Sequence, residues 1–413
     1  MSVNVVAMEC EIKDRISDLP LFILHKILSG LPRKGAARTS VLSRRWHSVW
    51  NSFPFLYFDH TLDDDVDDVD GFVDLVDKSL QRFVRSNLLI QRFDLNFYFG
   101  HDTDLLSRVD QWVESVMDNG VRHFVLSVAS ASEQDGQGFT LLDYVLPEKT
   151  FVPKKIDGCS SRFYSLGGLS LTHIRISESI IRDIIHYCPN IESFSLALFS
   201  GLKTLEISKL GKLQVLRVSA RRGLRELLSV SVDAPNLKFF KYSSYEPNLP
   251  CKISLTSCHD LQDLSLNDCA ITDDLFHSHL SGFPRLEALT MSGCYALQRV
   301  KISARRLSRL RLSHCDKIEV IEIDAPHLSS FRYETSKMPI LFYENVPCPI
   351  KITYVFRDNS RELSSSWFLK LREFLGASNQ RNTFELNFVD KEVWQVIQIF
   401  HCYLFIYFPI FRL

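Results

Sequence analysis

Three cysteines stand at one fixed offset after strand-like segments, and by type they are the residues of this chain best suited to bind a metal. Cys269, Cys294 and Cys315 end the stretches LSLNDC, LTMSGC and LRLSHC, and His314 stands beside the last of them. Zinc needs four such ligands converging on a tetrahedron. One thiol every 21 to 25 residues forms a column instead. We therefore expect a buried ladder of thiols whose S–H groups face turn carbonyls, and no metal.

An acidic run offers a second possible metal chemistry. The segment DDDVDDVD at 63–70 lacks the glycine and the terminal glutamate of a calcium-binding EF-hand loop. A solvated, self-repelling linker is the default interpretation. The motifs GxSxG, Walker A, HExxH and GxGxxG do not occur, and the 13 histidines are scattered. We expect a protein that is not an enzyme and requires no cofactor.

The cysteines are positioned by a repeat of six-residue segments. Each segment has apolar residues at its first, fourth and sixth places and variable residues at the other three. This alternation predicts a strand with one buried face, and the starts lie 21 to 25 residues apart, which is the leucine-rich-repeat (LRR) period. The repeat occurs as IESFSL at 191, LQVLRV at 213, LKFFKY at 237, LQDLSL at 261, LEALTM at 286, LSRLRL at 307 and LSSFRY at 328.

Weaker copies halfway between these segments predict strands on the opposite, convex side. They are LKTLEI at 202, LRELLSV at 224, CKISL at 251, LQRVKI at 297 and IEVIEI at 318. The stretch 271–284 predicts a helix that ends at Gly282 and Pro284. Two longer duplications support the array: VSARRGL at 218 matches ISARRLS at 302, and VDAPNLKFFKY at 232 matches IDAPHLSSFRY at 323.

The array begins less regularly. Strands are predicted at 92–99, 121–128 and 169–176, with a helix at 109–119 between the first two. The segment SASEQDGQG at 130–138 is predicted to be a surface loop.

Residues 14–50 predict three short helices. Pro20 stands near the start of the first, which carries a broad apolar face and ends at Gly30 and Pro32. A second helix is expected at about 34–42, and Ser43 caps a third that carries Trp46. Helices this few bury too little surface to be stable alone, so another domain or another protein must cover them.

The order of these pieces, ISDLP, IL, LP and TSVLSRRW, resembles the F-box of plant F-box/LRR-repeat proteins. The resemblance implies an N-terminal three-helix F-box that binds a Skp-type adaptor, and through it a cullin and a RING subunit. The residues that match the adaptor-contacting positions of the family are Leu19, Pro20, Ile23, Leu24, Ile27, Leu31, Pro32, Val41, Leu42 and Trp46. Beside them, Arg33, Lys34, Arg38, Arg44 and Arg45 form a basic surface, which we interpret as a solvated helix face or a complement to an acidic adaptor.

Composition limits the other partners. A net charge of −1 on 413 residues gives no support for nucleic-acid binding. Ten cysteines without a CxxC pair, behind an N-terminus that lacks the features of a signal peptide, indicate reduced thiols in the cytoplasm or nucleus.

The C-terminus departs from the related plant proteins, which often continue into an FBD domain. Residues 364–388 resemble the approach to that domain, after which the pattern stops. The apolar stretch 396–411 holds only Gln398 and His401 as clearly polar groups, and Pro409 interrupts it. It is either a short membrane anchor, a cap on the last repeat, or a remnant without a role. Because it is shorter than the ~17 to 20 residues of a usual span, we do not expect a membrane protein.

The expected fold class is α/β, a three-helix F-box followed by an LRR solenoid with a curved parallel sheet and a convex side of strands, loops and some helices. The expected division is a flexible N-terminus at 1–13, the F-box at 14–54, an acidic linker and connecting helix at 55–90, the LRR domain at 91–345, a cap or truncated FBD-like region at 346–388, and an apolar tail at 389–413.

The resemblance implies a substrate-recognition subunit of an SCF-type ubiquitin ligase, in which the repeats hold a protein substrate of unknown identity. The variable strand positions that would face this substrate are Asp263, Ser265, Asn267, Thr290, Arg309 and Arg311. Alternatives are a binding scaffold without ubiquitination output, a degenerate paralogue, and a small-molecule sensor, although no basic floor for a polyphosphate is evident.

Overall fold

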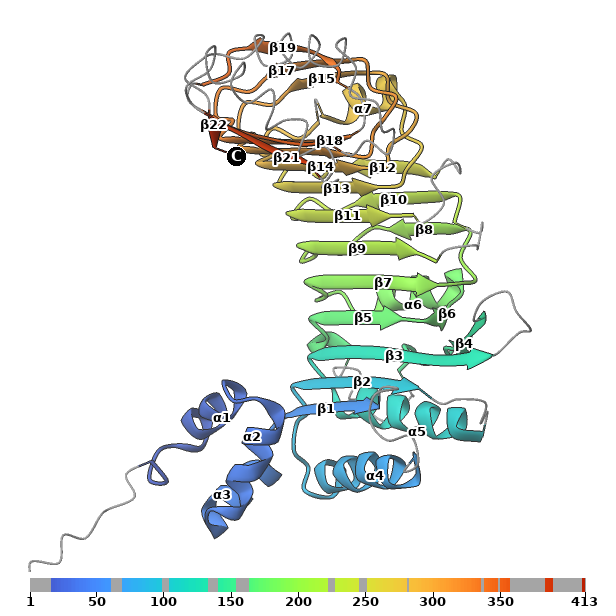
Figure 1. The fold of residues 1–413 in the computed structure, drawn as a ribbon. Coiled ribbons are helices and arrows are strands. Elements are labelled where there is room, and N and C mark those ends of the chain that lie inside the picture. The colour runs from blue at the N-terminus through green and yellow to red at the C-terminus, as the bar shows by residue number, and fades with distance from the viewer. Residues whose placement is uncertain are drawn as a thin grey trace, which may run out of the picture.

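The computed structural model describes residues 16–60, 69–98, 104–132, 140–153, 163–221, 227–244, 251–280, 282–335, 338–347, 350–356, 383–388 and 411–412. Within these ranges the chain forms an α/β molecule in which an N-terminal helical unit, residues 16–54, precedes a solenoid of parallel strands (Figure 1). This confirms the predicted fold class.

The N-terminal helical unit contains the predicted helices, with one difference. Its elements are α1 (Leu21–Ser29), α2 (Arg33–Arg38), a 3₁₀ turn η1 (Thr39–Val41) and α3 (Arg44–Asn51). The expected second helix at 34–42 tightens after Arg38. There the hydroxyls of Thr39 and Ser40 donate back to the carbonyls of Ala36 and Ala37 at 2.7 and 2.6 Å, and such local bonds compete with regular helix bonding.

A single long sheet runs through the solenoid, and every neighbouring pair of strands along it is parallel. All seven predicted repeat segments are strands of this sheet. Its members, in order, are β1 (Phe55–His60), β2 (Arg92–Tyr98), β3 (His123–Ser132), β5 (Gly168–Thr172), β7 (Ser193–Phe199), β9 (Val215–Ala220), β11 (Phe239–Ser243), β13 (Asp263–Asn267), β14 (Ala288–Ser292), β16 (Arg309–Ser313), β18 (Ser330–Thr335), β20 (Lys351–Phe356), β21 (Thr383–Phe388) and β22 (Phe411–Arg412).

Two short parallel sheets, here called the outer sheets, line the opposite side, as the weaker copies predicted. One contains β8 (Thr204–Ile207), β10 (Ser229–Asp233) and β12 (Lys252–Thr256), and the other β15 (Arg299–Ser303), β17 (Val320–Asp324) and β19 (Ile340–Glu344). The strand predicted from 224 begins only at Ser229. Figure 1 shows the array bending toward its C-terminal end, with β15, β17 and β19 on the outer side of the bend.

Helices cover the same side, three of them near the start of the array and one, the last along the chain, beside β15 in its later part. They are α4 (Val69–Arg85), α5 (Asp104–Asn119), α6 (Glu178–Tyr187) and the predicted single-repeat helix α7 (Asp273–Leu280). A 3₁₀ turn η2 (Phe163–Ser165) precedes β5.

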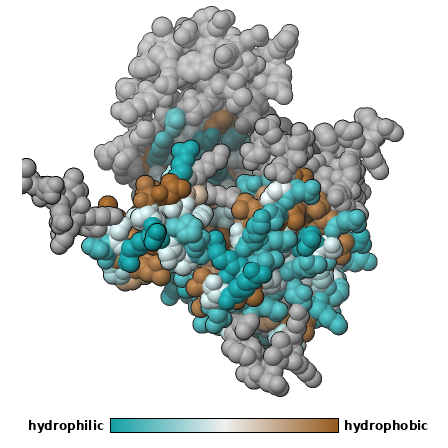
Figure 2. All heavy atoms as spheres, turned by 90° about the horizontal axis from the view of Figure 1, so that it is seen from below, coloured by the Kyte–Doolittle hydropathy of each residue, from teal (hydrophilic) through white to brown (hydrophobic). Residues whose placement is uncertain are grey.

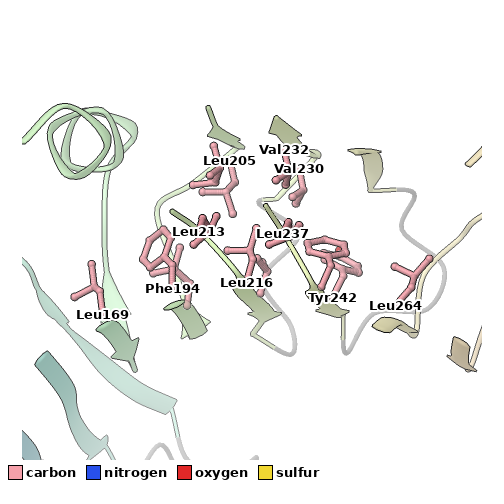
Figure 3. Packing of buried hydrophobic residues seen from close by; sticks show 14 of the residues in the cluster. Leu169, Phe194, Leu205, Leu213, Leu216, Val230, Val232, Leu237, Tyr242 and Leu264 are labelled. Carbon is pink, nitrogen blue, oxygen red and sulfur yellow. The ribbon is translucent and has the colours of Figure 1, made fainter. Parts of the chain in front are cut away.

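The core lies between the long sheet and the outer layer. Strand residues alternate, so that Leu216 and Val218 of β9 point inward while Arg217 between them is exposed. Figure 3 shows the inward side chains of successive repeats in contact, with Phe194, Leu216 and Tyr242 facing Leu205 and Val230 of the first outer sheet. Each repeat therefore covers the apolar face of its neighbour, as in other solenoids.

Two expectations need correction at the start of the array. The segment expected as linker and connecting helix, 55–90, contains β1, which pairs with β2 from Phe55 to His60. Leu56 and Phe58 point into the core, so the alternation of FLYFDH was the available signal. The expected loop at 130–138 begins as strand, because Ala129–Ser132 pair with the antiparallel β4 (Thr140–Val145), which in turn pairs with β6 (Ile174–Arg175).

One of the two duplications has no structural counterpart. VDAPNLKFFKY and IDAPHLSSFRY both run from an outer strand into a strand of the long sheet, β10 to β11 and β17 to β18. VSARRGL, however, leaves the long sheet at β9, whereas ISARRLS leaves an outer sheet at β15.

Several expectations fall outside the described residues. These are the N-terminus 1–13, most of the acidic run, and the tail 396–411 except Phe411. Within 346–388 the described residues include β20 and β21, which continue the long sheet. No helix among the described residues is long and apolar enough to cross a membrane.

Candidate functional site

The N-terminal helical unit has its own small core, and two predicted adaptor contacts belong to it. Leu24 is 0% and Trp46 7% exposed, and they pack with Leu28, Ala36, Val49 and Phe53. Because Leu24 and Leu28 are one helical turn apart, the face of α1 that they share points at α3 and not outward. The structure therefore gives Leu24 and Trp46 a role in holding the unit together, and their contact with an adaptor stays a prediction.

The other predicted contacts lie on the surface or close to it. Val41 is 84% and Leu42 68% exposed, and Ile27 and Leu31 are exposed to a smaller degree. Pro20 and Pro32 are exposed, and Leu19 and Ile23 half-buried. We call the exposed large hydrophobic side chains between Leu21 and Leu42 the apolar patch: Leu21, Phe22, Ile27, Leu31, Val41 and Leu42. Figure 2 shows hydrophobic side chains on the surface of the unit, at the left of the view.

The sequence analysis missed two members of the apolar patch. Leu21 is about half exposed and Phe22 is 69% exposed. The signal was available, since a unit of this size cannot bury both sides of an apolar helix such as α1. Once Leu24 and Leu28 define the buried side, Leu21 and Phe22 remain outside.

Polar contacts fix the helices that carry the apolar patch. The Ser43 hydroxyl accepts a hydrogen bond from the Trp46 N–H at 3.2 Å and caps α3 as predicted. Arg45 donates to the carbonyl of Leu19 at 2.9 Å. His25 Nε2 lies 3.3 Å from the Val49 carbonyl, and burial lowers its pKa. These contacts join α1 to α3, so the patch is displayed on a fixed frame.

Backbone and side-chain contacts attach the helical unit to the solenoid. The N–H groups of Gln91 and Arg92 donate to the Pro54 carbonyl at 2.9 and 3.1 Å. Arg82 of α4 donates to the side-chain oxygen of Asn51 at 3.0 Å. The rings of Phe53 and Phe55, on either side of the boundary, lie 5.2 Å apart. The apolar patch is thereby held at one end of the solenoid (Figure 1).

The second candidate surface is the outward face of the long sheet. Because the register is continuous, the single variable position within each repeat segment falls opposite its equivalent in the next strand. We call this set the central row. From β9 to β18 its members are Arg217, Lys241, Ser265, Thr290, Arg311 and Arg332.

The structure brings the predicted substrate-facing residues together on this face. Arg309 and Arg311 are exposed, and Asp263, Asn267 and Thr290 are half-buried. Ser265 is the exception, because it is only 8% exposed. Its short side chain lies between the longer Lys241 and Thr290 of the neighbouring strands, and its contact with a substrate stays a prediction.

Three cationic members of the central row were missed, although their positions were visible. Arg217, Lys241 and Arg332 occupy the same fifth place in LQVLRV, LKFFKY and LSSFRY that Arg311 occupies in LSRLRL. Their neighbours set their environment. The Arg217 guanidinium lies 4.7 Å from the Phe239 ring centroid, and Arg332 pairs with Glu334 at 3.5 Å. Burial raises the pKa of Asp263, and the charge of Arg309 partly offsets this.

The cysteine column forms as predicted. Cys269 and Cys294 are buried with their sulfur atoms 3.6 Å apart. Cys294 Sγ lies 3.7 Å from the Leu266 carbonyl, and Cys315 Sγ lies 3.3 Å from that of Ser313. These S–H groups face carbonyls of strands β13 and β16 and not the turn carbonyls that we expected. The described residues contain no group of three or more His, Cys, Asp or Glu side chains that could hold a metal ion.

Comparison with known proteins matches both parts of the chain. Residues 16–58 match the model of the F-box domain. Residues 84–256 and 245–364, together more than half of the chain, match the family model described as At1g61320/AtMIF1, LRR domain.

Individual relatives come from Arabidopsis thaliana. The chain is 29% identical over 269 residues to an F-box/LRR-repeat protein, covering 63% of this chain and 53% of the relative. It is also 30% identical over 239 residues to F-box/LRR-repeat protein 25, covering 56% of this chain and 87% of that protein. F-box/LRR-repeat protein 13 is 28% identical over 253 residues, 56% of this chain and 52% of that protein. The aligned part thus spans about half the length of the first and the third of these relatives.

Proposed function

Because the chain belongs to the F-box/LRR-repeat family of plants, we propose that it is the substrate-recognition subunit of an SCF-type ubiquitin ligase. The F-box and the LRR domain together give it the build of a substrate adaptor. In the proposed complex the F-box binds a Skp-type adaptor, which connects it to a cullin and a RING subunit. The long sheet holds a protein substrate at the other end.

The observation that carries this proposal is the apolar patch on a rigid helical unit. Exposed apolar surface gathered in one place marks a protein-binding site. Val41, Leu42 and Phe22 are among the most exposed large apolar side chains of the described residues. Burying them against a partner is favourable by the hydrophobic effect.

The chain itself would contribute proximity to the reaction. The helical unit has its own core and is joined to the solenoid, whose core is continuous, through the Arg82–Asn51 hydrogen bond and the contact of Phe53 with Phe55. A substrate held on the long sheet is therefore kept at a high effective concentration near the ubiquitin-carrying enzyme of another subunit. The chain needs to supply no catalytic group for this purpose.

The test is direct binding between the full chain and a purified Skp-type adaptor. We expect Val41→Asp with Leu42→Asp to weaken adaptor binding at least ~10-fold, because two carboxylates would be buried in an apolar contact. The matched control is Leu89→Asp, since Leu89 is 72% exposed but lies outside the helical unit. It should bind as the unchanged chain does. Equal binding by all three proteins would contradict the proposed use of the patch.

A stoichiometric scaffold without ubiquitination output would use the same apolar patch. Whether a cullin accompanies the adaptor-bound chain separates the two functions.

A further inference from the structure

The central row carries two pairs of positive charges. Arg217 lies directly opposite Lys241 across β9 and β11, and Arg311 lies directly opposite Arg332 across β16 and β18. Like charges at directly opposite positions of a sheet destabilise it. Such an arrangement on an outward face is relieved when a ligand brings negative charge.

The sheet supplies little of that negative charge itself. Between β5 and β20 the central row contains no acidic residue, since its other members are Ser170, Ser195, Ser265, Thr290 and Thr353. Glu334 pairs with Arg332, and the guanidinium of Arg217 lies over Phe239. Among the described residues, no carboxylate lies within ion-pair distance of Lys241 or Arg311.

Small residues separate the two cationic pairs. Ser265 and Thr290 occupy the central row between Lys241 and Arg311, and Ala288, Ser292 and Asn267 flank them on the same two strands. We call this stretch of short side chains on β13 and β14 the floor. It has a cationic pair at each end. Lys241 and Arg311 are three strands apart, which corresponds to about 14 Å at the usual strand separation of ~4.8 Å.

We propose that this floor binds an extended acidic segment of a protein, which runs along the central row with carboxylates four residues apart. An extended chain rises ~3.4 Å per residue and turns alternate side chains to opposite sides. Side chains at positions i and i+4 therefore point the same way at about 14 Å, which matches the separation of the two cationic pairs. The inference rests on the proposed function and specifies the substrate class of that receptor.

A protein segment fits better than a nucleic acid. The positive charge gathers along the central row, with Arg309 beside Arg311 on the same face, and Glu334 and Asp263 lie on either side of the row. A continuous phosphate backbone would be repelled by these carboxylates, whereas two separated carboxylates of a peptide meet only the cationic pairs.

The experiment measures fluorescence anisotropy of labelled nine-residue peptides with the full chain at low salt. One peptide carries glutamates at positions 3 and 7 of a Gly/Ser background, and the other carries the same two glutamates side by side. We expect tighter binding of the first peptide. Lys241→Glu with Arg311→Glu should weaken that binding at least ~10-fold, without lowering the melting temperature because like-charge repulsion is removed.

Arg299→Glu is the matched control, because Arg299 is an exposed strand arginine on an outer sheet. This variant should bind the first peptide as tightly as the unchanged chain does. Equal binding by all three proteins, or no preference between the two peptides, would overturn the proposal. A peptide bound only with phosphoserine in place of glutamate would overturn the carboxylate assignment, and tighter binding of a single-stranded oligonucleotide would overturn the protein assignment.

Adaptor binding, measured on the same preparations, keeps the two proposals apart. A chain that binds the adaptor but neither peptide contradicts this inference alone. A chain that binds the first peptide but no adaptor contradicts the proposed function and leaves an acidic-peptide-binding solenoid.

Discussion

At the scale of single residues, Gly293 turns the chain after β14 in a conformation that few other residues adopt. Its φ is +63°, and an added Cβ would lie 2.1 Å from an oxygen of Asp268. The Asp268 carboxylate can rotate away, but the left-handed backbone cannot change without moving the next repeat. Asp268 and His314 adopt the same left-handed conformation after β13 and β16, with φ of +51° and +53°, and glycine adopts it after β14 without the strain of a Cβ.

We expect Gly293→Ala to lower the free energy of unfolding by about 1–2 kcal/mol, the usual cost of a left-handed conformation for a residue with a Cβ. Urea unfolding of the full chain measures the change. Gly211→Ala is the control, since Gly211 has open space around its Cα, and it should be close to neutral. Equal effects of the two substitutions would contradict the conformational explanation.

Cys188 links folding to alkaline pH. It follows α6 and is fully buried, and burial raises the pKa of its thiol from 9.0 to about 12. The unfolded chain loses this proton near pH 9, whereas the folded chain keeps it. The stabilisation by the buried neutral thiol is therefore complete below pH 9 and is lost progressively as the pH rises toward 12.

We expect Cys188→Ala to reduce the decline of unfolding free energy between pH 8 and pH 10.5. Urea unfolding under a reductant at several pH values measures this decline for both proteins. Cys251 and Cys258 also have raised pKa values through burial, so part of the decline should remain. Parallel curves for the variant and the unchanged chain would rule out a contribution from Cys188.

At the scale of elements, two helices of the outer layer use the same device to join the next outer strand. Glu178, in the first turn of α6, accepts a hydrogen bond from the backbone N–H of Lys203 at 3.0 Å. Asp273, in the first turn of α7, accepts from the N–H groups of Gln298 and Arg299 at 2.9 and 3.1 Å. Each carboxylate satisfies backbone donors at the start of an outer strand, and so fixes the helix against the following repeat.

We expect Asp273→Ala to destabilise the chain by about 1–2 kcal/mol, because it leaves two backbone donors without their charged acceptor. Asp274→Ala provides a matched control in the same helical turn, since Asp274 is exposed and would lose only its interaction with the helix dipole. Differential scanning calorimetry compares the two. If the melting temperature falls equally for both variants, the loss of stability comes from the dipole of α7 and not from the hydrogen bonds of Asp273.

Most strands of the solenoid could be predicted from the sequence because each repeats one alternation of buried and exposed positions. LQDLSL and LSRLRL, for instance, place their leucines in the core as β13 and β16. β1 was missed because it lies before the first regular repeat. The end of β3 was missed because Ala129–Ser132 carry no apolar alternation and become strand only through pairing with β4.

At the scale of the whole molecule, the chain displays two surfaces on one continuous scaffold. The apolar patch lies on the helical unit at the start, and the central row lies on the long sheet (Figure 1). Phe53, Phe55 and the Arg82–Asn51 hydrogen bond join the two parts. Binding at one surface therefore positions the other, which is the property that a substrate receptor requires.

Only part of the candidate site could be predicted. The order of motif residues identified the helical unit, but it did not separate Leu24 and Trp46, which form its core, from Val41 and Leu42, which face outward. That division depends on how three helices pack, and all four residues are equally apolar. The central row could not be predicted from any single repeat. It depends on the register between neighbouring strands, which places Arg217 opposite Lys241.

The most direct test of the account is recovery of partners by the full chain from plant extract, compared with its Val41→Asp/Leu42→Asp variant and the Leu89→Asp control. The account predicts that a Skp-type adaptor and a cullin are recovered together with the unchanged chain and the control, and that both are lost with the patch variant. Adaptor without cullin would indicate a scaffold. Recovery of neither partner by soluble, folded chain would contradict the central claim.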